Sequence, residues 1–324
     1  MSMYEAIKNF PKQFEYEPRI ENGENLKRRA IFIVAGMGGS HLAGDIVQAW
    51  SPSLDVIVHS DYGISRYPKS VLANALIIAS SYSGNTEETI SAFREARDRG
   101  LDIIVISTGG KLIELAKEQS VPYIEMPDTG IQPRSALGFS FAALLKAIGE
   151  EEALAQLRNL ATLLDPEAYE DAGRAFAEKL KGKVPVIYSS RANQAIAYNW
   201  KIKFNETGKI PAFYNVFPEL NHNEMTGFDV KDATKKLSES FYFFILRDTE
   251  DHPSVIKGIK ILERLYKDRG LSVEVLDIEG QGKLHKIFSS LILADWIAYY
   301  TAEQYGLESE QVPMVEEFKK LIAE

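Results

Sequence analysis

The segment IFIVAGMGGSHLAGDIV joins an apolar, β-branched run to a helical pattern through a loop of small residues. The loop residues are Gly36, Gly38, Gly39 and Ser40. Glycines before a helix let backbone N–H groups converge on an anion, and the helix dipole favours negative charge at the same place. This chemistry suits a phosphate group. A tight strand-to-helix turn that binds nothing accounts for the same glycines equally well.

A second loop, in ASSYSGNTEETI, adds hydroxyl groups before another helical pattern. Ser81, Ser83 and Thr86 surround Gly84, and hydroxyls can donate hydrogen bonds to phosphate oxygens. Neither loop has a Walker-type lysine, and the first departs from the dinucleotide fingerprint because its third glycine follows immediately. We therefore predict a small phosphorylated metabolite as the ligand. Helix capping and turn formation are the alternative roles of these hydroxyls.

Proton transfer is the chemistry expected of NWKIKFNETGK and of the polar cluster ELNHNEMTG. Trp200 and Phe204 continue a four-residue apolar period and Gly208 lies just beyond them, so Glu206 is predicted near a helix C-terminus. A carboxylate there, or the imidazole of His222, can take a proton from a bound substrate. By residue type alone, a solvated glutamate and a solvated histidine account for both positions.

The composition describes a globular chain without thiol chemistry. Of 324 residues, 45% are hydrophobic and 26% charged, which allows a sizeable core and favours two domains. The absence of cysteine excludes disulfides, thiolate metal sites and cysteine nucleophiles, and the five histidines are too scattered for a zinc pattern. The net charge is −9 with basic and acidic residues interspersed, so no nucleic-acid partner is expected.

Targeting signals and membrane spans are not expected either. The N-terminus carries acidic residues and has no apolar h-region, and no run of about 18 apolar residues occurs in the chain. These features predict a cytoplasmic protein that does not contact a membrane.

Alternating apolar runs and helical periods predict an α/β fold with mostly parallel sheets. In the first half, strands are expected at residues 30–35, 55–59, 75–80, 102–107 and 121–125, and helices at 41–50, 86–99 and 111–118. In the second half, strands are expected at 184–189, 240–246 and 272–277, and helices at 192–206, 253–268 and 283–304. We divide the chain into domains at 1–150 and 183–324, joined by a helical linker at 151–182.

The last segment, residues 313–323, is predicted to be an amphipathic helix. Val315, Phe318 and Ile322 recur at helical spacing and are expected on its buried side.

Three short segments, GMGGSHLAGD, SYSGNTEET and QPRSALGFSF, precede the long block NWKIKFNETGKIPAFYNVFPELNHNEMTGF. Together they resemble the bifunctional phosphoglucose/phosphomannose isomerases, a family with tandem sugar isomerase (SIS) domains. The segments follow the family's order through both domains, and VPMVEEFKK matches its terminal lysine position. The resemblance implies two SIS-type three-layer αβα sandwiches with mostly parallel sheets.

The activity implied by this resemblance is aldose–ketose isomerisation without a metal or cofactor. Glucose 6-phosphate, together with mannose 6-phosphate, would interconvert with fructose 6-phosphate through a cis-enediol intermediate. His41 and Val312 depart from the family pattern, which has a small residue and can have a threonine at these positions. These departures leave the preference between the glucose and mannose epimers open.

The resemblance also implies roles for individual residues. Phosphate would be bound by Ser40, Ser81, Ser83 and Thr86 and by the amides of Gly38 and Gly39. The implied catalytic residues are Glu206 as base, His222 in ring opening, Lys319 as terminal lysine and Arg134 beside the intermediate. Because the family's histidine crosses a dimer interface, we expect a homodimer in which His222 is shared.

Other readings remain open at this point. Lys319 can be explained by the helix dipole alone, and Arg134 by an ion pair at the domain boundary. A non-catalytic phosphosugar sensor would use the same loops, and so would an SIS isomerase for an amino-sugar or heptose phosphate.

Overall fold

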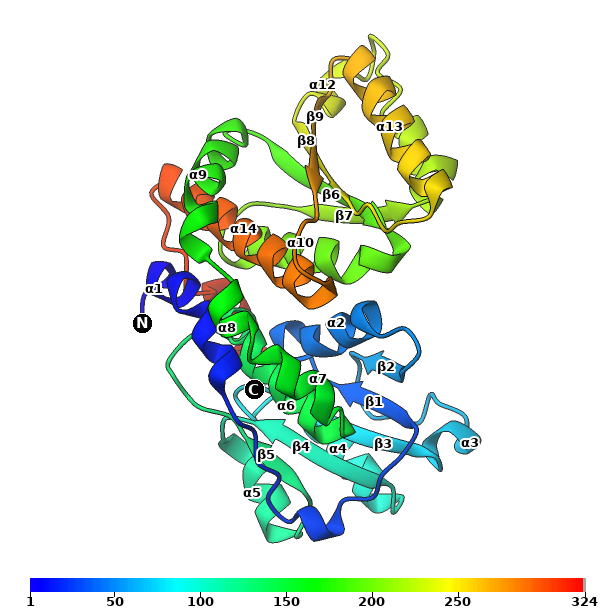
Figure 1. Cartoon of the computed structure of the whole chain (residues 1–324), viewed down its shortest axis with the longest axis vertical. Coiled ribbons are helices and arrows are strands. Elements are labelled where there is room, and N and C mark those ends of the chain that lie inside the picture. Colours follow the sequence, from blue (N-terminus) through cyan, green and yellow to red (C-terminus); the bar gives the residue numbers. More distant parts are fainter. Residues whose placement is uncertain (323–324) are drawn as a thin grey trace. The chain divides into compact units, whose positions relative to one another are not determined.

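The chain forms two compact units, described for residues 1–322 by a computed structural model (Figure 1). The first unit contains residues 9–164, and the second contains residues 2–8 together with the chain from residue 165 onward. The segment 151–182, predicted as a linker, is divided between the units. Helices α7 (Glu151–Leu157) and α8 (Leu160–Leu163) belong to the first, and α9 (Glu170–Lys179) to the second.

The first unit is built on a five-stranded sheet in the order β2-β1-β3-β4-β5, with every neighbouring pair parallel. The strands are β1 (Ile31–Ala35), β2 (Asp55–His59), β3 (Ala75–Ser80), β4 (Asp102–Ser107) and β5 (Tyr123–Glu125). All five occur where the apolar runs predict them, although β5 begins two residues later than expected. β3 is buried along its whole length, as expected for a central parallel strand.

Helices cover both faces of this sheet, which makes the unit a three-layer sandwich. They are α2 (Leu42–Trp50), α3 (Lys69–Leu72), α4 (Glu87–Asp98), α5 (Gly110–Glu118) and α6 (Leu137–Ile148). Phe93 of α4 and Leu112 of α5 pack in one core with Ile77 of β3. On the opposite face, α2 packs over Val34, where Gly44 allows the helix to approach closely.

The second unit repeats this design with a four-stranded parallel sheet in the order β7-β6-β8-β9. Its strands are β6 (Val184–Ser190), β7 (Phe213–Phe217), β8 (Phe241–Arg247) and β9 (Ser272–Asp277). The sequence analysis did not predict β7. Its segment FYNVF has an exposed Phe213 and a polar Asn215, because an edge strand is only partly buried.

The helices of the second unit are α1 (Met3–Lys8), α9, α10 (Gln194–Glu206), α11 (Glu224–Gly227), α12 (Lys235–Ser238), α13 (Pro253–Asp268), α14 (Lys283–Gln304) and α15 (Pro313–Ile322). Aromatic rings fill both sides of the sheet. Phe243 of β8 packs against Tyr266 of α13 on one face. Phe244 stacks on Phe204 of α10 on the other, with ring centroids 6.1 Å apart.

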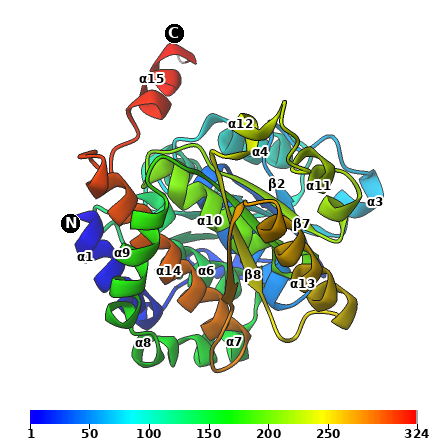
Figure 2. The ribbon, with the colours of Figure 1, turned by 90° about the horizontal axis from the view of Figure 1, so that it is seen from above.

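The C-terminal helix α15 forms where the sequence predicts it, and residue 323 lies outside the described part of the chain. Its apolar side is exposed, with 45% of Val315, 62% of Phe318 and 51% of Ile322 accessible. The prediction that these side chains are buried is therefore wrong for the chain as described. Figure 2 shows α15, in red, standing apart from the other elements of its unit.

No helix within residues 1–322 is both long enough and apolar enough to cross a bilayer. This includes α14, which has 22 residues.

The contact between α9 and α14 depends on a glycine. A Cβ atom added to Gly173 would lie 2.3 Å from Cβ of Trp296. We predict that Gly173→Ala lowers the free energy of unfolding by about 1–3 kcal/mol, because overpacking outweighs the higher helix propensity of alanine. Urea denaturation followed by circular dichroism measures this change.

Gly258→Ala is the matched control, because Gly258 is also helical and its nearest contact would be Nδ2 of Asn221 at 3.5 Å. This control should keep or increase stability. Wild-type stability in Gly173→Ala would contradict the packing argument.

Candidate active site

The first sheet reverses its winding direction at β1. The chain passes from β1 through α2 to β2 on one side, and β3 lies on the other side of β1. The loops that follow β1 and β3 therefore meet beside this switch point at the carboxyl edge, which is where parallel α/β sheets bind their ligands. A Cβ atom on Gly36 would lie 2.7 Å from the carbonyl oxygen of Ser80, so only glycine permits this approach.

The first loop forms a short 3₁₀ helix, η3 (Gly38–Ser40), in which Gly38 takes a left-handed conformation with φ of 52°. Ser40 is buried and joins this loop to the second one. Its Oγ accepts a hydrogen bond from the Tyr82 amide at 2.9 Å, and its carbonyl accepts one from Ser80 Oγ at 2.8 Å. The two loops predicted to hold phosphate are therefore directly connected.

The second loop is closed by its own hydroxyl groups. Ser81 is buried, and its Oγ lies 2.8 Å from Oγ1 of Thr86 and accepts a bond from the Gly84 amide at 3.1 Å. Ser83 is exposed, and its Oγ accepts a bond from the Asn85 amide at 3.3 Å. Thr86 directly precedes the first residue of α4, so the loop ends at a helix N-terminus that favours anions.

A third loop, which the sequence analysis did not select, supports the second one. Gly84 has φ of 70°, and a Cβ atom there would lie 1.9 Å from the carbonyl oxygen of Gly109. A Cβ atom on Gly110 would lie 2.3 Å from the carbonyl oxygen of Ser83. The Lys111 amide also donates to the Asn85 side chain at 3.0 Å. The glycine pair after β4, in STGGK, was the signal available in the sequence.

Arg134 lies beside the first loop. It belongs to the 3₁₀ helix η4 (Pro133–Ser135) and is only 2% exposed. A Cβ atom on Gly39 would lie 2.9 Å from the Arg134 amide nitrogen, so η4 packs directly against η3. The first unit thus places the backbone of the buried Arg134 against the glycine loop.

His41, which follows the first loop, is buried and held by a carboxylate. Its Nδ1 lies 2.8 Å from Oδ2 of Asp45, one turn later in α2. This contact fixes the orientation of the imidazole at the start of α2.

Glu206 is the last residue of α10, as the periodicity predicts. The amides of Thr207 and Gly208 both donate to the Lys203 carbonyl, at 2.9 and 3.0 Å. However, the left-handed residue that ends the helix is Lys209, with φ of 58°, and not Gly208. Gly208 is required for space, because a Cβ atom there would lie 2.9 Å from the Phe204 carbonyl oxygen.

His222 ends the 3₁₀ helix η7 (Glu219–His222), which follows β7, and it is exposed. The chain just beyond it is held by Glu224, which the sequence analysis did not select. Oε1 of Glu224 accepts a hydrogen bond from Tyr188 OH and Oε2 accepts one from Asn215 Nδ2, both at 2.5 Å. Burial, with this neighbouring carboxylate, raises the pKa of Tyr188, so the phenol stays a donor.

Lys319 is exposed on α15, and its ammonium group pairs with Oε1 of Glu316 at 2.8 Å. The three residues predicted for proton transfer in the second unit thus lie on three different elements, α10, η7 and α15. The residues predicted for phosphate binding and Arg134 lie together in the first unit.

The corresponding edge of the second sheet has different chemistry. Asp248 and Asp251 follow β8 and are buried, and Asn193 from the loop after β6 donates to both, at 3.4 and 3.3 Å. Lys286 of α14 donates to Asp248 at 3.0 Å. Burial raises the pKa of Asp251. Carboxylates at this edge disfavour a phosphate, so the two sheets are not equivalent as anion sites.

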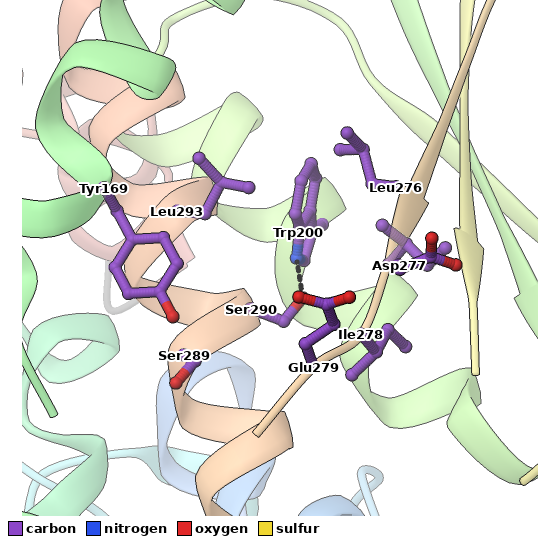
Figure 3. A pocket seen from close by; sticks show the side chains of 10 residues that line it. Tyr169, Trp200, Leu276, Asp277, Ile278, Glu279, Ser289, Ser290 and Leu293 are labelled. Atoms are coloured by element: carbon purple, nitrogen blue, oxygen red, sulfur yellow. Dashed lines mark hydrogen bonds between the residues drawn. The ribbon is translucent and has the colours of Figure 1, made fainter. Parts of the chain in front are cut away.

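The second unit also contains a small cavity of about 90 Å³ (Figure 3). Trp200, Leu276 and Leu293 line its apolar side, and Trp200 Nε1 donates to Ser290 Oγ at 3.0 Å. None of the predicted site residues, all of which lie within residues 1–322, lines this cavity.

Comparison with known proteins shows similarity along the whole chain. Residues 170–322 match the bacterial phospho-glucose isomerase C-terminal SIS domain. A bifunctional phosphoglucose/phosphomannose isomerase from Caldicellulosiruptor bescii is 35% identical and covers 99% of both chains. One from Aquifex aeolicus is 33% identical and covers 98% of this chain and 97% of its own. The chain belongs to the bifunctional phosphoglucose/phosphomannose isomerase family.

Two further comparisons extend this result. A D-glucosamine-6-phosphate 4-epimerase from Sulfolobus acidocaldarius is 31% identical over 69% of this chain and 71% of its own. The crystal structure of glucosamine-6-phosphate deaminase from Thermotoga maritima superposes with a TM-score of 0.68 at 18% identity, covering 96% and 97% of the two chains. The tandem SIS fold expected for this isomerase family is therefore confirmed.

The Gly84–Gly109 contact in this isomerase-family chain leads to a stability prediction. Gly84→Ala should lower the free energy of unfolding by about 1–3 kcal/mol more than Gly100→Ala, as measured by urea denaturation. Gly100 is the control because its φ of 65° is similar but a Cβ atom there would meet nothing within 4 Å. If both variants lost the same free energy of unfolding, backbone strain alone would explain why glycine is required at position 84, and the loop contact would not be needed.

Proposed function

We propose that this protein is an isomerase that interconverts glucose 6-phosphate and mannose 6-phosphate with fructose 6-phosphate. The observation that carries the proposal is the full-length similarity to phosphoglucose/phosphomannose isomerases, and the joined glycine and serine loops of the first unit support it. A phosphomonoester fits such loops, because backbone amides, hydroxyls and a helix N-terminus stabilise its charge without a metal.

The phosphate group would be bound by the amides of Gly38 and Gly39 and by the hydroxyls of Ser40, Ser81, Ser83 and Thr86. Burial of Ser40 and Ser81 supports this role, because their bonds to neighbouring loop atoms keep the loops in one conformation. Ser83 is exposed and can turn toward a ligand. Such preorganisation reduces the entropy that is lost when the phosphosugar binds.

Glu206 would carry out the proton transfer. Its carboxylate takes the proton from carbon 2 of the open-chain aldose, the electron pair of that C–H bond forms the carbon 1–carbon 2 double bond, and the π pair of the carbon 1 carbonyl moves to oxygen 1. The proton of oxygen 2 passes to oxygen 1, the electron pair left on oxygen 2 forms the carbonyl at carbon 2, and the carbon–carbon π pair takes the proton back from Glu206 at carbon 1, which gives the ketose. Because carbon 2 is planar in the enediol, the same intermediate leads to either the glucose or the mannose epimer.

Three other residues complete the proposed mechanism. His222 would exchange a proton with the ring oxygen as the sugar opens, and Arg134 would stabilise negative charge on the enediol oxygens. Lys319 would act near the same oxygens as the family's terminal lysine. We also propose a homodimer that shares His222 between its subunits, and the exposure of His222 supports this arrangement.

Glu206→Gln tests the assignment of the base. The amide has the same shape but cannot accept the proton, so turnover in a coupled glucose 6-phosphate assay should fall by about 10²–10⁴-fold, with KM little changed. Exchange of the carbon 2 proton with deuterated solvent should fall in parallel.

Glu303→Gln is the control, because Glu303 also lies in the last turn of a helix and is exposed. It should keep wild-type turnover. Glu206→Gln turnover within about twofold of wild type would show that another group is the base.

A non-catalytic phosphosugar sensor gives a different result in the same experiments. It would bind fructose 6-phosphate in a calorimeter, yet the wild-type protein would not exchange the carbon 2 proton with solvent.

The similarity to a glucosamine-6-phosphate 4-epimerase favours one second candidate, an activity on amino-sugar phosphates. A panel of glucose, mannose and glucosamine 6-phosphates, followed by NMR, separates the two. Conversion of the first two to fructose 6-phosphate supports the isomerase, whereas inversion at carbon 4 of glucosamine 6-phosphate alone supports the second candidate.

A further inference from the structure

Lys209 connects two elements of the second unit through backbone carbonyl groups. Its ammonium nitrogen donates to the carbonyl oxygen of Glu206 at 2.6 Å and also to the carbonyl oxygen of Gln311. Glu206 is the last residue of α10, and Gln311 lies two residues before α15. One side chain therefore links the helix end that carries the proposed base to the start of the C-terminal helix.

The conformation of the turn after α10 directs the Lys209 side chain to these acceptors. Lys209 adopts φ of 58°, a left-handed conformation that is unfavourable for a residue with a Cβ atom. The Asn205 side chain closes the same turn by donating to the Ile210 carbonyl at 3.0 Å. Carbonyls in the last turn of a helix have no partner within the helix, so an ammonium group with three donors suits this position.

The segment between α14 and α15 is held at other points as well. The Glu308 carboxylate accepts bonds from the amides of Glu310 and Gln311, at 2.6 and 2.7 Å. Glu310 in turn accepts a bond from the Met3 amide at 2.8 Å, and Ser309 is buried. The start of α15 is thus fixed to the second unit, although the helix itself is exposed.

Lys319 lies six residues beyond Pro313, which is about 9 Å along an α-helix. Its distance from the end of α10 therefore depends on where α15 begins. We propose that Lys209 is a positioning residue, which holds the start of α15 at the end of α10 and so keeps Lys319 in place relative to Glu206. This inference rests on the proposed function, in which both residues act on one sugar phosphate.

Four variants test the inference: Lys209→Met, Lys209→Arg, Lys319→Met and the double variant Lys209→Met/Lys319→Met. In a glucose 6-phosphate assay, Lys209→Met should lower kcat by about 10- to 100-fold, because small misplacements of catalytic groups cost that much. KM should change by less than about twofold, because the phosphate loops are untouched. Lys209→Arg, which can also donate to two carbonyls, should restore most of the activity.

The double variant separates positioning from general damage. If Lys209 acts through Lys319, the double variant should be as active as Lys319→Met alone. Losses that multiply would overturn the proposal.

Hydrogen exchange of the backbone amides of residues 309–319 tests the link between Lys209 and Gln311 directly, and this measurement does not depend on an enzyme assay. Exchange should be faster in Lys209→Met than in the wild type. It should be unchanged in the control Lys183→Met, which removes another lysine-to-carbonyl bond in the same unit, from Lys183 to Glu239 at 2.6 Å. Unchanged exchange in Lys209→Met would overturn the proposal. Wild-type turnover in Lys319→Met would instead reject the proposed role of Lys319, whatever the exchange data show.

Discussion

The close approach of backbone segments at the carboxyl edge of the first sheet is the constraint on which the candidate site depends. Gly36 lies against Ser80, Gly39 against η4, and Gly84 against Gly109, each at a distance that excludes a Cβ atom. These contacts bring the ends of β1, β3 and β4 together with Arg134 in one small region. Glycine is therefore needed here to let loops meet, and the same geometry leaves loop amides at the place where we propose that phosphate binds.

The two units show how one topology can support different chemistry. Both sheets reverse direction at their first strand, and both present loops at the carboxyl edge beside that strand. In the first unit these loops offer glycines and hydroxyls, and in the second they offer buried carboxylates paired with Lys286. This difference supports the proposed roles of the two units, in which the first would bind the phosphate and the second would supply the proton-transfer groups from other elements.

The candidate residues of the second unit depend on neighbours that hold their backbone. Glu224 ties the chain after His222 to β6 and β7, and Lys209 ties the end of α10 to the start of α15. Neither residue needs to touch a substrate to matter. Each bonds to atoms of a neighbouring element, the Glu224 carboxylate to side chains of β6 and β7 and the Lys209 ammonium group to the carbonyl before α15.

The sequence by itself determined the features that depend on local spacing. Apolar runs located eight of the nine strands of residues 1–322, the four-residue period placed Glu206 at a helix end, and the two polar loops predicted an anion site at the carboxyl edge of the first sheet. The motifs also carried the family resemblance, because they are contiguous segments. The edge strand β7 was missed because its burial is partial and its pattern is broken by Asn215.

Only the tertiary structure decided which distant segments meet. The support of Gly84 by Gly109, the position of Arg134 beside Gly39, and the Lys209 link to Gln311 join residues far apart in the chain. The apolar period of α15 specified a helix but not a covering surface, and the structure leaves that side exposed. Local periodicity reflects the burial of one element, whereas contacts between loops depend on how all elements pack.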